Sequence, residues 1–343
     1  MACKNAAFPT GEPMKDAPSI TEVAALAGVS IATVSRVLNS SKPVNEQTRL
    51  RVEAAVAKLG YRANPFGRSL AKSESHLLLV LVPDFSNPFY AQILKGVESV
   101  TRRRGYKLLL ADDSNAWTER GEPLDLSYFQ LVDGVISLTH VDGRPELMAE
   151  LAARPWVACS EFPSSGPVPH VSIDHRQAAI DAVQYLLNSG HRRIALIAAE
   201  EGYLWAQQRR EGYVAALQRA GIEPNPEFIR TVVDTDYESG GQAAGSLLAL
   251  AELPTAVFAM SDTLAIGAVK AFRRKGKRVP EDIAVVGFDN LPLSAVFEPA
   301  LTTIAQPMRE LGEAAASLLL QRLVGAEPAS RTLPHHLVLR ESA

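Results

Sequence analysis

The chain has 343 residues, 47% of them hydrophobic and 21% charged, a balance typical of a soluble globular protein long enough for more than one domain. The longest purely apolar run, Leu77–Val82, is far too short to cross a bilayer, and residues 1–19 contain Pro and Gly where a signal peptide needs an apolar stretch. Cys3 and Cys159 give no disulfide framework, so we expect a cytoplasmic protein with no membrane partner.

Charge is distributed unevenly along the chain. The formal net charge is −3, but residues 15–72 contain nine basic and four acidic side chains, a local charge of +5 that leaves −8 for the rest. A basic segment joined to an acidic body is expected when only that segment meets a polyanion. An ordinary solvated surface is the alternative, and it would be favoured if charge were the only evidence.

Two predicted helices near the N-terminus follow one another across a tight turn. Ser19 is a good N-cap, Glu22 three residues later completes a capping box, and Gly28 is suited to end the helix. Ser30 caps a second helix that runs to about Leu38. The apolar positions are Val23, Ala24 and Ala27 in the first helix and Val34, Val37 and Leu38 in the second.

A third helix completes this region. Asn45 caps it, Gly60 ends it, and its apolar face consists of Val52, Ala55, Val56 and Leu59. Three short helices with a Gly-bearing turn between the first two predict a helix-turn-helix domain over residues 18–63. A plain three-helix scaffold with an exposed arginine is the alternative.

In a helix-turn-helix, the second helix enters the DNA major groove and its N-terminal residues contact base edges. We therefore expect double-stranded DNA as a partner. The residues predicted to face the bases are Ile31, Ala32 and Arg36, and those placed for phosphate oxygens are Ser30, Ser35 and Asn39. Arg36 could bind guanine in a bidentate manner, and Ile31 or Ala32 could contact a thymine methyl group.

Residues 64–75 are predicted to form a linker that contains a short hinge helix. Asn64 is a suitable N-cap and Pro65 occupies the favoured first position, whereas Gly67 weakens the helix by roughly 1 kcal/mol relative to Ala. Asn64 would then lie at the DNA, and Leu70 would be an apolar wedge for a minor-groove step. A flexible connector with an incidental leucine is the alternative.

From His76 onward the pattern changes to short apolar runs that alternate with helical stretches. Continuous apolar strands separated by helices predict parallel sheets covered on both faces, an α/β fold. Because ligands bind such sheets at the carboxyl ends of the strands, Asp84, Asp262 and Asp289 are of interest. The length of this region favours two lobes.

Many segments of the chain occur, in order, in one known family. They include "ITEVAALAGVSIATVSRVLN", "VPDFSNPFYAQILKGVE", "GHRRIALI", "SDTLAIGAV", "VPEDIAVVGFDN" and "PALTTIAQPMRELG". On these blocks the chain resembles the LacI/GalR family of bacterial transcriptional regulators from Ile20 onward. Two departures are Gly67, where many members carry Ala, and the long segment 1–17, which we expect to be a disordered tail.

The resemblance implies a homodimer in which each subunit has a helix-turn-helix, a hinge helix and a two-lobed body like periplasmic sugar-binding proteins. The expected lobes are discontinuous: one comprises residues 76–174 and 306–334, and the other residues 175–305 and 335–343. Tetramers are less expected than dimers because the sequence stops at "HHLVLRESA" without a heptad segment.

The resemblance also implies site residues. Arg209 and Asp289 match effector-contacting positions, Phe89, Trp205 and Thr235 match further cleft positions, and Ile31, Ala32, Arg36 and Leu70 match DNA-contacting positions. A guanidinium and a carboxylate on opposite lobes would suit a small sugar- or nucleoside-like effector with vicinal hydroxyls, and the aromatic rings could stack on it. An interlobe salt bridge is the alternative for Arg209 and Asp289, and plain packing is the alternative for Phe89 and Trp205.

Other function classes stay open at this point. An enzyme is disfavoured because the sequence has no G-x-S-x-G elbow and no P-loop, and its seven histidines show no metal-ligand spacing, so we expect no cofactor, metal or catalytic residue. A solute-binding protein would need export and would leave the basic N-terminal domain unexplained. A regulator of the same fold controlled mainly by a protein partner on DNA is the remaining alternative.

Overall fold

The computed structural model describes residues 18–39, 43–61, 74–113, 124–164 and 166–343. The chain divides into two compact units, Met1–Ser75 and His76–Ala343. The expected N-terminal tail lies outside the described residues, as do Asn64 and Leu70 of the predicted hinge helix.

The first unit, the N-terminal module, contains three helices. They are α1 (Ile20–Ala27), α2 (Ile31–Asn39) and α3 (Glu46–Leu59). The predicted capping box is confirmed, because the Ser19 hydroxyl accepts from the Glu22 nitrogen at 3.3 Å and the Glu22 carboxylate accepts from the Ser19 nitrogen at 2.6 Å. Gly28 adopts φ 63°, a left-handed conformation that favours glycine, and ends α1. The chain bends by 101° between α1 and α2, as in a helix-turn-helix.

A small apolar core holds the three helices together. Its buried members are Val23, Ala24, Ala27, Val34, Val52 and Ala55. Val37 and Leu38 of α2 and Val56 and Leu59 of α3 are partly buried against it, as the periodicity predicted. Because α2 uses Val34 and these neighbours for packing, its opposite side remains exposed.

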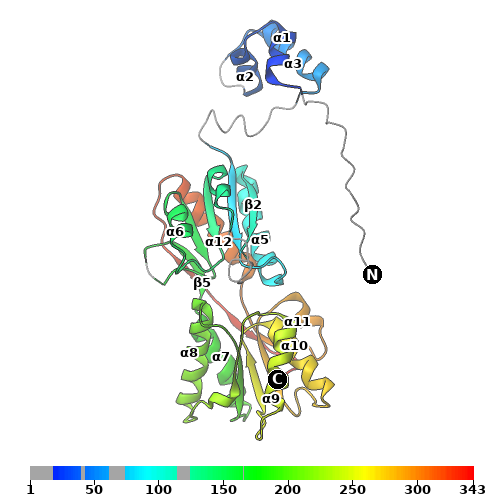
Figure 1. Ribbon diagram of the computed structural model, residues 1–343, viewed down its shortest axis with the longest axis vertical. Coiled ribbons are helices and arrows are strands. Elements are labelled where there is room, and N and C mark those ends of the chain that lie inside the picture. The colour runs from blue at the N-terminus through cyan, green and yellow to red at the C-terminus, as the bar shows by residue number, and fades with distance from the viewer. Residues whose placement is uncertain (1–17, 40–42, 62–73, 114–123, 165) are drawn as a thin grey trace, which may run out of the picture. The chain divides into compact units, whose positions relative to one another are not determined.

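The second unit, the body, consists of two lobes, each built on a six-stranded sheet (Figure 1). The sheet of the first lobe has the order β11-β5-β4-β3-β1-β2, and all its pairs are parallel. Its strands are β1 (Leu77–Val82), β2 (Lys107–Asp112), β3 (Gly134–Ser137), β4 (Trp156–Cys159), β5 (His170–Ile173) and β11 (Arg331–Leu333). Its helices are α5 (Pro88–Thr101), α6 (Pro145–Ala152) and α12 (Met308–Leu323), with the short 3-10 helices η1 (Arg102–Arg104) and η3 (Leu126–Leu131).

The sheet of the second lobe has the order β12-β10-β9-β8-β6-β7 and is parallel except for the β10–β12 pair. Its strands are β6 (Ile194–Ala199), β7 (Ile229–Val232), β8 (Ala256–Ala259), β9 (Ala284–Asp289), β10 (Thr302–Ala305) and β12 (His336–Val338). Its helices are α7 (His175–Asn188), α8 (Leu204–Arg219), α9 (Tyr237–Leu248), α10 (Asp262–Arg274) and α11 (Pro292–Val296), with the turn η4 (Pro226–Phe228).

Both faces of each sheet are buried, which is why the strands read as continuous apolar runs. In β1, Leu78, Val80 and Val82 belong to one buried cluster, whereas Leu79 and Leu81 belong to another on the opposite face. The parallel α/β fold predicted from these runs is confirmed. The strands β5, β7, β10 and β11, which are short and carry polar residues, were not predicted.

Two glycines bring helices α5 and α12 into close contact. A Cβ atom on Gly96 would lie 2.0 Å from the Arg309 carbonyl oxygen, and a Cβ atom on Gly312 would lie 2.1 Å from the Ile93 carbonyl oxygen. These backbones therefore approach more closely than any larger residue allows.

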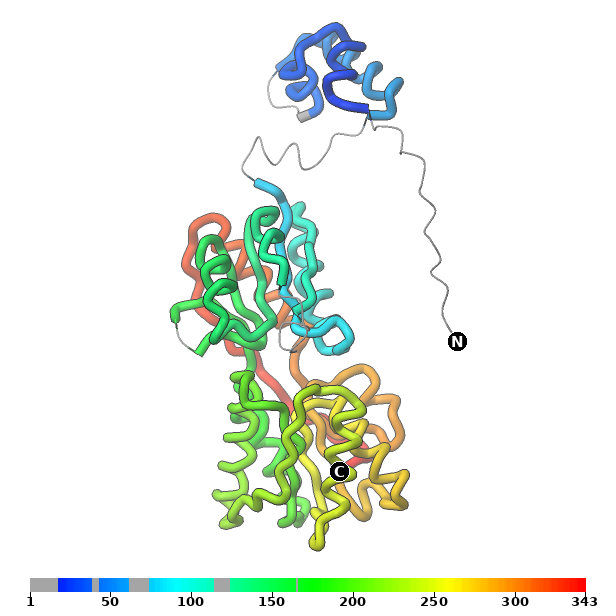
Figure 2. The backbone as a smooth tube through the Cα atoms, viewed as in Figure 1, coloured from blue at the N-terminus to red at the C-terminus, as the bar shows by residue number. Residues whose placement is uncertain are grey.

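The chain crosses between the lobes three times, from β5 to α7, from β10 to α12 and from β11 to β12 (Figure 2). Within the described part of the chain, no single helix is long and apolar enough to cross a membrane. Helices α1 and α2 together have the length and apolar composition of a membrane span, but the chain is bent between them.

Candidate DNA-reading helix and interlobe cavity

The residues of α2 predicted to contact bases lie on its exposed side. Ile31 is 47% exposed although it is a large apolar residue, and Ala32 and Arg36 are exposed as well. An exposed isoleucine and arginine at the start of a helix suit contacts with base edges. All three side chains are thus accessible, and Ala32 and Arg36 lie on the side of α2 opposite the buried Val34.

The predicted phosphate-contacting residues have different surroundings. The Ser30 hydroxyl caps α2 by accepting from the Thr33 nitrogen at 3.2 Å and lies 2.9 Å from the Thr33 hydroxyl. Ser35 is half-buried and already takes part in an interaction. The side chain of Asn39 lies outside the described part of the chain, like Asn64 and Leu70.

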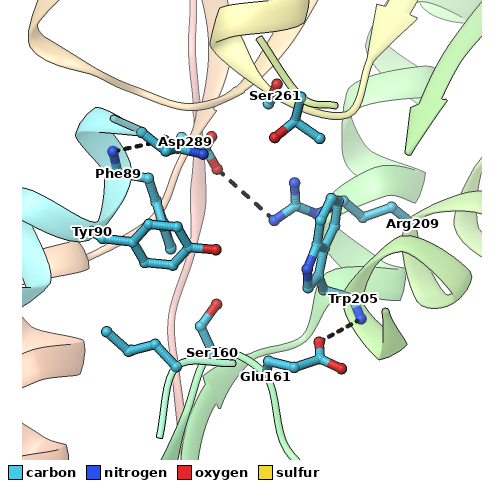
Figure 3. Close-up of a pocket in the computed structure, with 11 residues that line it drawn as sticks. Phe89, Tyr90, Ser160, Glu161, Trp205, Arg209, Ser261 and Asp289 are labelled. Atoms are coloured by element: carbon cyan, nitrogen blue, oxygen red, sulfur yellow. Dashed lines mark hydrogen bonds and ion pairs between the residues drawn. The ribbon is translucent and has the colours of Figure 1, made fainter. Parts of the chain in front are cut away.

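In the body, all five residues predicted to bind an effector line one cavity between the lobes (Figure 3). Its walls come from loops and helix starts that follow the carboxyl ends of strands in both sheets, which is where α/β sheets bind ligands. The first lobe contributes Asn87, Phe89, Tyr90, Leu138, Ser160 and Glu161, and the second contributes Trp205, Arg209, Thr235, Ser261 and Asp289. The cavity volume is about 40 Å³, which corresponds to about three water molecules.

Arg209 is buried at the centre of the second-lobe wall. Its guanidinium donates to the Met260 carbonyl oxygen, lies 3.3 Å from His175 Nδ1 and lies over the ring of Phe288, 3.5 Å from its centroid. The Trp205 ring centroid is 4.6 Å away on the cavity side. Burial lowers the pKa of Arg209 to about 10, with Asp289 opposing the shift, so the group stays charged at neutral pH. The site therefore offers a fixed cation between aromatic rings.

The expectation that Arg209 and Asp289 lie on opposite lobes is wrong. Arg209 belongs to α8 and Asp289 ends β9, and the chain does not leave the second lobe between residues 175 and 305. Arg209 Nη2 and Asp289 Oδ1 are 3.9 Å apart, an ion pair inside one lobe. This ion pair therefore cannot hold the lobes together.

Asp289 is held in a strained and nearly dehydrated position. Its φ is 115°, which is unfavourable for a non-glycine residue. Its Oδ1 accepts from Gln306 Nε2 at 2.7 Å, and Gln306 lies in the connection from β10 to α12. Burial raises the pKa of the Asp289 carboxyl above its ordinary value, and the Arg209 guanidinium opposes this shift. Such a strained residue in a cavity is typical of a functional site.

Two buried polar atoms near Arg209 and Asp289 have no hydrogen-bond partner among the described residues. They are His175 Nε2 and Gln306 Oε1. Burial and the nearby Arg209 charge keep the pKa of His175 well below its ordinary value, so the imidazole is neutral. Buried polar atoms are nearly always hydrogen-bonded in native proteins, so these two are available to water or a ligand.

Glu161 is a functional candidate that the sequence did not reveal. It lies two residues after the end of β4 in the first lobe and is 2% exposed. Its Oε1 accepts from the Leu204 nitrogen at 2.9 Å and its Oε2 lies 3.4 Å from the Trp205 nitrogen, at the start of α8 in the second lobe. His140 Nδ1 lies 3.1 Å from the same carboxylate. An acidic residue two positions after a buried strand was the available signal.

The other acidic residues noted after strands do not line the cavity. The Asp262 carboxylate is fully buried and accepts from the Ser294 hydroxyl at 2.6 Å and the Leu291 nitrogen at 2.7 Å, so it stabilises the second lobe internally. Asp84 accepts from the Ser86 nitrogen at 2.7 Å within its own loop. Tyr90, which was also missed, directs its hydroxyl into the cavity (Figure 3).

Comparisons with known proteins match both units. Residues 19–64 match the model "Bacterial regulatory proteins, lacI family", and residues 183–343 match a periplasmic binding protein-like domain. The chain is 38% identical to the HTH-type transcriptional repressor CytR of Escherichia coli (strain K12), over 95% of this chain and 96% of that protein. It is 34% identical to catabolite control protein A of Priestia megaterium, over 94% of this chain and 98% of that protein.

Solved structures give the same result. The lac repressor dimer bound to operator and the anti-inducer ONPF is 29% identical, with a TM-score of 0.80 over 95% of this chain and 98% of that chain. The complex of the transcriptional regulator CelR with cellobiose is 35% identical, with a TM-score of 0.72 over 95% of this chain and all of that chain. These relatives are regulators rather than enzymes. The chain belongs to the LacI family of bacterial transcriptional regulators and is a DNA-binding regulator.

Proposed function

We propose that this regulator represses transcription as a homodimer on a palindromic operator, and that a small sugar- or nucleoside-like effector in the interlobe cavity sets its DNA affinity. The cavity carries the proposal: Arg209 and Asp289 offer a donor and an acceptor side by side, which suits vicinal hydroxyls. Phe89 and Trp205 line the same space and suit the face of a sugar ring or a base. CelR, whose structure contains cellobiose, has the same fold.

A groove on the first lobe supports the homodimer. It runs along α5 and the edge strand β2 and has a volume of about 620 Å³. Leu94, Leu108 and Leu110 line it, and Leu110 is 43% exposed. An exposed apolar surface at a sheet edge is a liability unless another chain covers it, and a second copy of this chain is the occupant we propose.

The effector would act by shifting the population of DNA-competent states. Closure of the lobes around a ligand changes the body, and a ligand with different affinity for two states shifts their equilibrium by that difference. Control mainly by a protein partner on DNA is the second candidate. The cavity volume of about 40 Å³ favours it, since a sugar ring enters only after the lobes or side chains move apart.

The test is selection of bound duplexes from a random DNA pool, repeated with a panel of sugars and nucleosides. We expect an enriched palindrome whose recovery changes with one compound. A palindrome that is indifferent to every compound would favour control by a protein partner. Absence of enrichment would contradict operator recognition itself.

A further inference from the structure

Four exposed basic side chains lie together at one end of the first lobe. Arg102, Arg103 and Arg104 form the turn η1 at the end of α5, and Lys107 begins β2. Residues 99–111 contain no acidic side chain. These four residues are called the linker-side basic cluster.

The cluster lies beside the point where the linker joins the body. The Lys107 nitrogen donates to the His76 carbonyl oxygen at 2.9 Å, and the Tyr106 ring lies 5.3 Å from the His76 ring, centroid to centroid. His76 is the first residue of the body, so the cluster flanks the attachment of the chain that leads to the DNA-binding module.

Local acidic groups neutralise only part of this charge. Arg102 forms an ion pair with Glu98 at 3.6 Å, although its side chain is 80% exposed. Arg103 Nε donates to the Ser99 carbonyl oxygen at 2.7 Å, which uses one donor but leaves the charge uncompensated. Arg104 forms no ion pair with any residue that the structure describes. Arg103, Arg104 and Lys107 are therefore exposed and form no ion pair within the part of the chain that the structure describes.

This concentration of charge contrasts with the rest of the body. Residues 76–343 contain 25 basic and 32 acidic side chains, a net charge of −7 that would repel DNA. Tyr61 and Glu74 are 13 residues apart, so the connection that tethers the body to the module covers at most about 45 Å even when fully extended. We propose that the linker-side basic cluster binds the phosphate backbone of DNA beside the site that the module recognises.

The proposal goes beyond recognition of an operator, because phosphate contacts are independent of sequence. A random-sequence duplex of about 40 base pairs is therefore a sufficient probe. The full-length triple variant Arg103→Gln, Arg104→Gln, Lys107→Gln removes three charges and leaves the Arg102–Glu98 pair in place. Affinity is measured by fluorescence anisotropy between 50 and 200 mM salt.

The second lobe offers a matched control. Residues 273–278 contain five basic side chains, and Arg274→Gln, Lys275→Gln, Lys277→Gln changes the net charge by the same amount as the cluster variant. We expect the cluster variant to lower the slope of log affinity against log salt by up to ~2.7 per chain, about 0.9 per lost phosphate contact. The affinity deficit would then be up to ~40-fold larger at 50 mM than at 200 mM salt. The control variant should have the same slope of log affinity against log salt as the unmodified protein.

A charge-conserving variant distinguishes the effect of lost charge from the effect of a disturbed structure. Arg103→Lys, Arg104→Lys should keep the salt slope if the cluster acts through phosphate contacts, and a loss in this variant would point instead to damage at the end of α5. Equal slopes for the cluster variant, the control and the unmodified protein would overturn the proposal. Failure of the unmodified protein to bind any duplex would overturn DNA binding itself and is a distinct result.

Discussion

The Glu161 carboxylate and the Leu204 backbone nitrogen are 2.9 Å apart and join the two lobes through a hydrogen bond. Tyr203, the N-cap residue of α8, makes no side-chain capping bond, so Glu161 supplies from the first lobe the acceptor that α8 lacks. An anionic group at a helix N-terminus is favourable because it faces unpaired N–H groups and the positive end of the helix dipole. When the lobes separate, α8 loses this cap.

Glu161→Ala should therefore favour the open body. A hydrogen bond to a charged group contributes about 1.5–3 kcal/mol, so the balance between closed and open forms should shift by at least tenfold. Small-angle X-ray scattering should report a larger radius of gyration. Glu223→Ala, at an exposed position, serves as the control, and Glu161→Gln should be intermediate because the amide keeps one acceptor oxygen. Scattering identical to that of the unmodified protein would show that Glu161 does not hold the lobes together.

Arg36→Ala should relax base preference at one position of each half-site. A bidentate arginine–guanine contact contributes about 1–3 kcal/mol of discrimination, so the preferred base should lose roughly 5- to 150-fold of its advantage. Competition binding with single-base variants of the selected DNA measures this. An equal loss on every sequence would assign Arg36 to phosphate instead.

Asp289→Asn should abolish the response to the effector while leaving DNA affinity largely intact. The lost charge-assisted hydrogen bond corresponds to about 1.5–3 kcal/mol of ligand affinity. Calorimetry with the compound identified in the selection, together with DNA binding by the same variant, checks both parts. Unchanged ligand affinity would remove Asp289 from the site.

The affinity of the unmodified protein for this compound should rise with pH. Burial raises the pKa of Asp289, so part of the carboxyl is protonated as the pH falls toward the acidic side of neutrality. A ligand hydroxyl that donates to the carboxylate favours the ionised form, and affinity is therefore gained as pH rises through the raised pKa. Calorimetry from pH 5 to 8 should show this rise in affinity. The affinity of the Asp289→Asn variant should not change over the same pH range.

Gly312→Ala should destabilise the first lobe. The added Cβ would lie 2.1 Å from the Ile93 carbonyl oxygen, so α5 and α12 must move apart, at a cost of about 1–3 kcal/mol. Gly245→Ala in α9 is the control, since its Cβ meets nothing within 4 Å and alanine should stabilise that helix by roughly 0.5–1 kcal/mol. Chemical denaturation of both variants measures the difference. Equal stabilities would mean that the helix contact adapts at no cost.

Local signals made much of the fold predictable. The capping box at Ser19 and the apolar run of β1 each depend on neighbours in the sequence, so the helix and the strand were recognised without knowledge of the fold. The strand β5 escaped detection because His170 and Ser172 interrupt its apolar residues, and it is defined by pairing with β4 and β11, the latter about 160 residues away. Such pairing leaves no local pattern.

For the site too, the residues could be predicted from the sequence but their arrangement in space could not. The resemblance named Arg209 and Asp289, and the structure brings them to one cavity, but their common lobe follows from the order of strands in a sheet. Glu161 acts on a helix 43 positions further along the chain, in the other lobe. No spacing rule connects two such segments, because their contact exists only when the lobes meet.

Gln306 belongs both to a connection between the lobes and to the hydrogen bonds of the cavity. It lies in one of the three connections about which the lobes must rotate, and it donates to the carboxylate that faces the cavity. Rotation of the lobes about this connection would alter the 2.7 Å bond, and the proposed ligand hydroxyl on Asp289 would compete with it or reinforce it. The affinity for the proposed ligand and the equilibrium between lobe arrangements would therefore be coupled through one amide, and by thermodynamic reciprocity each would change the other by the same free energy.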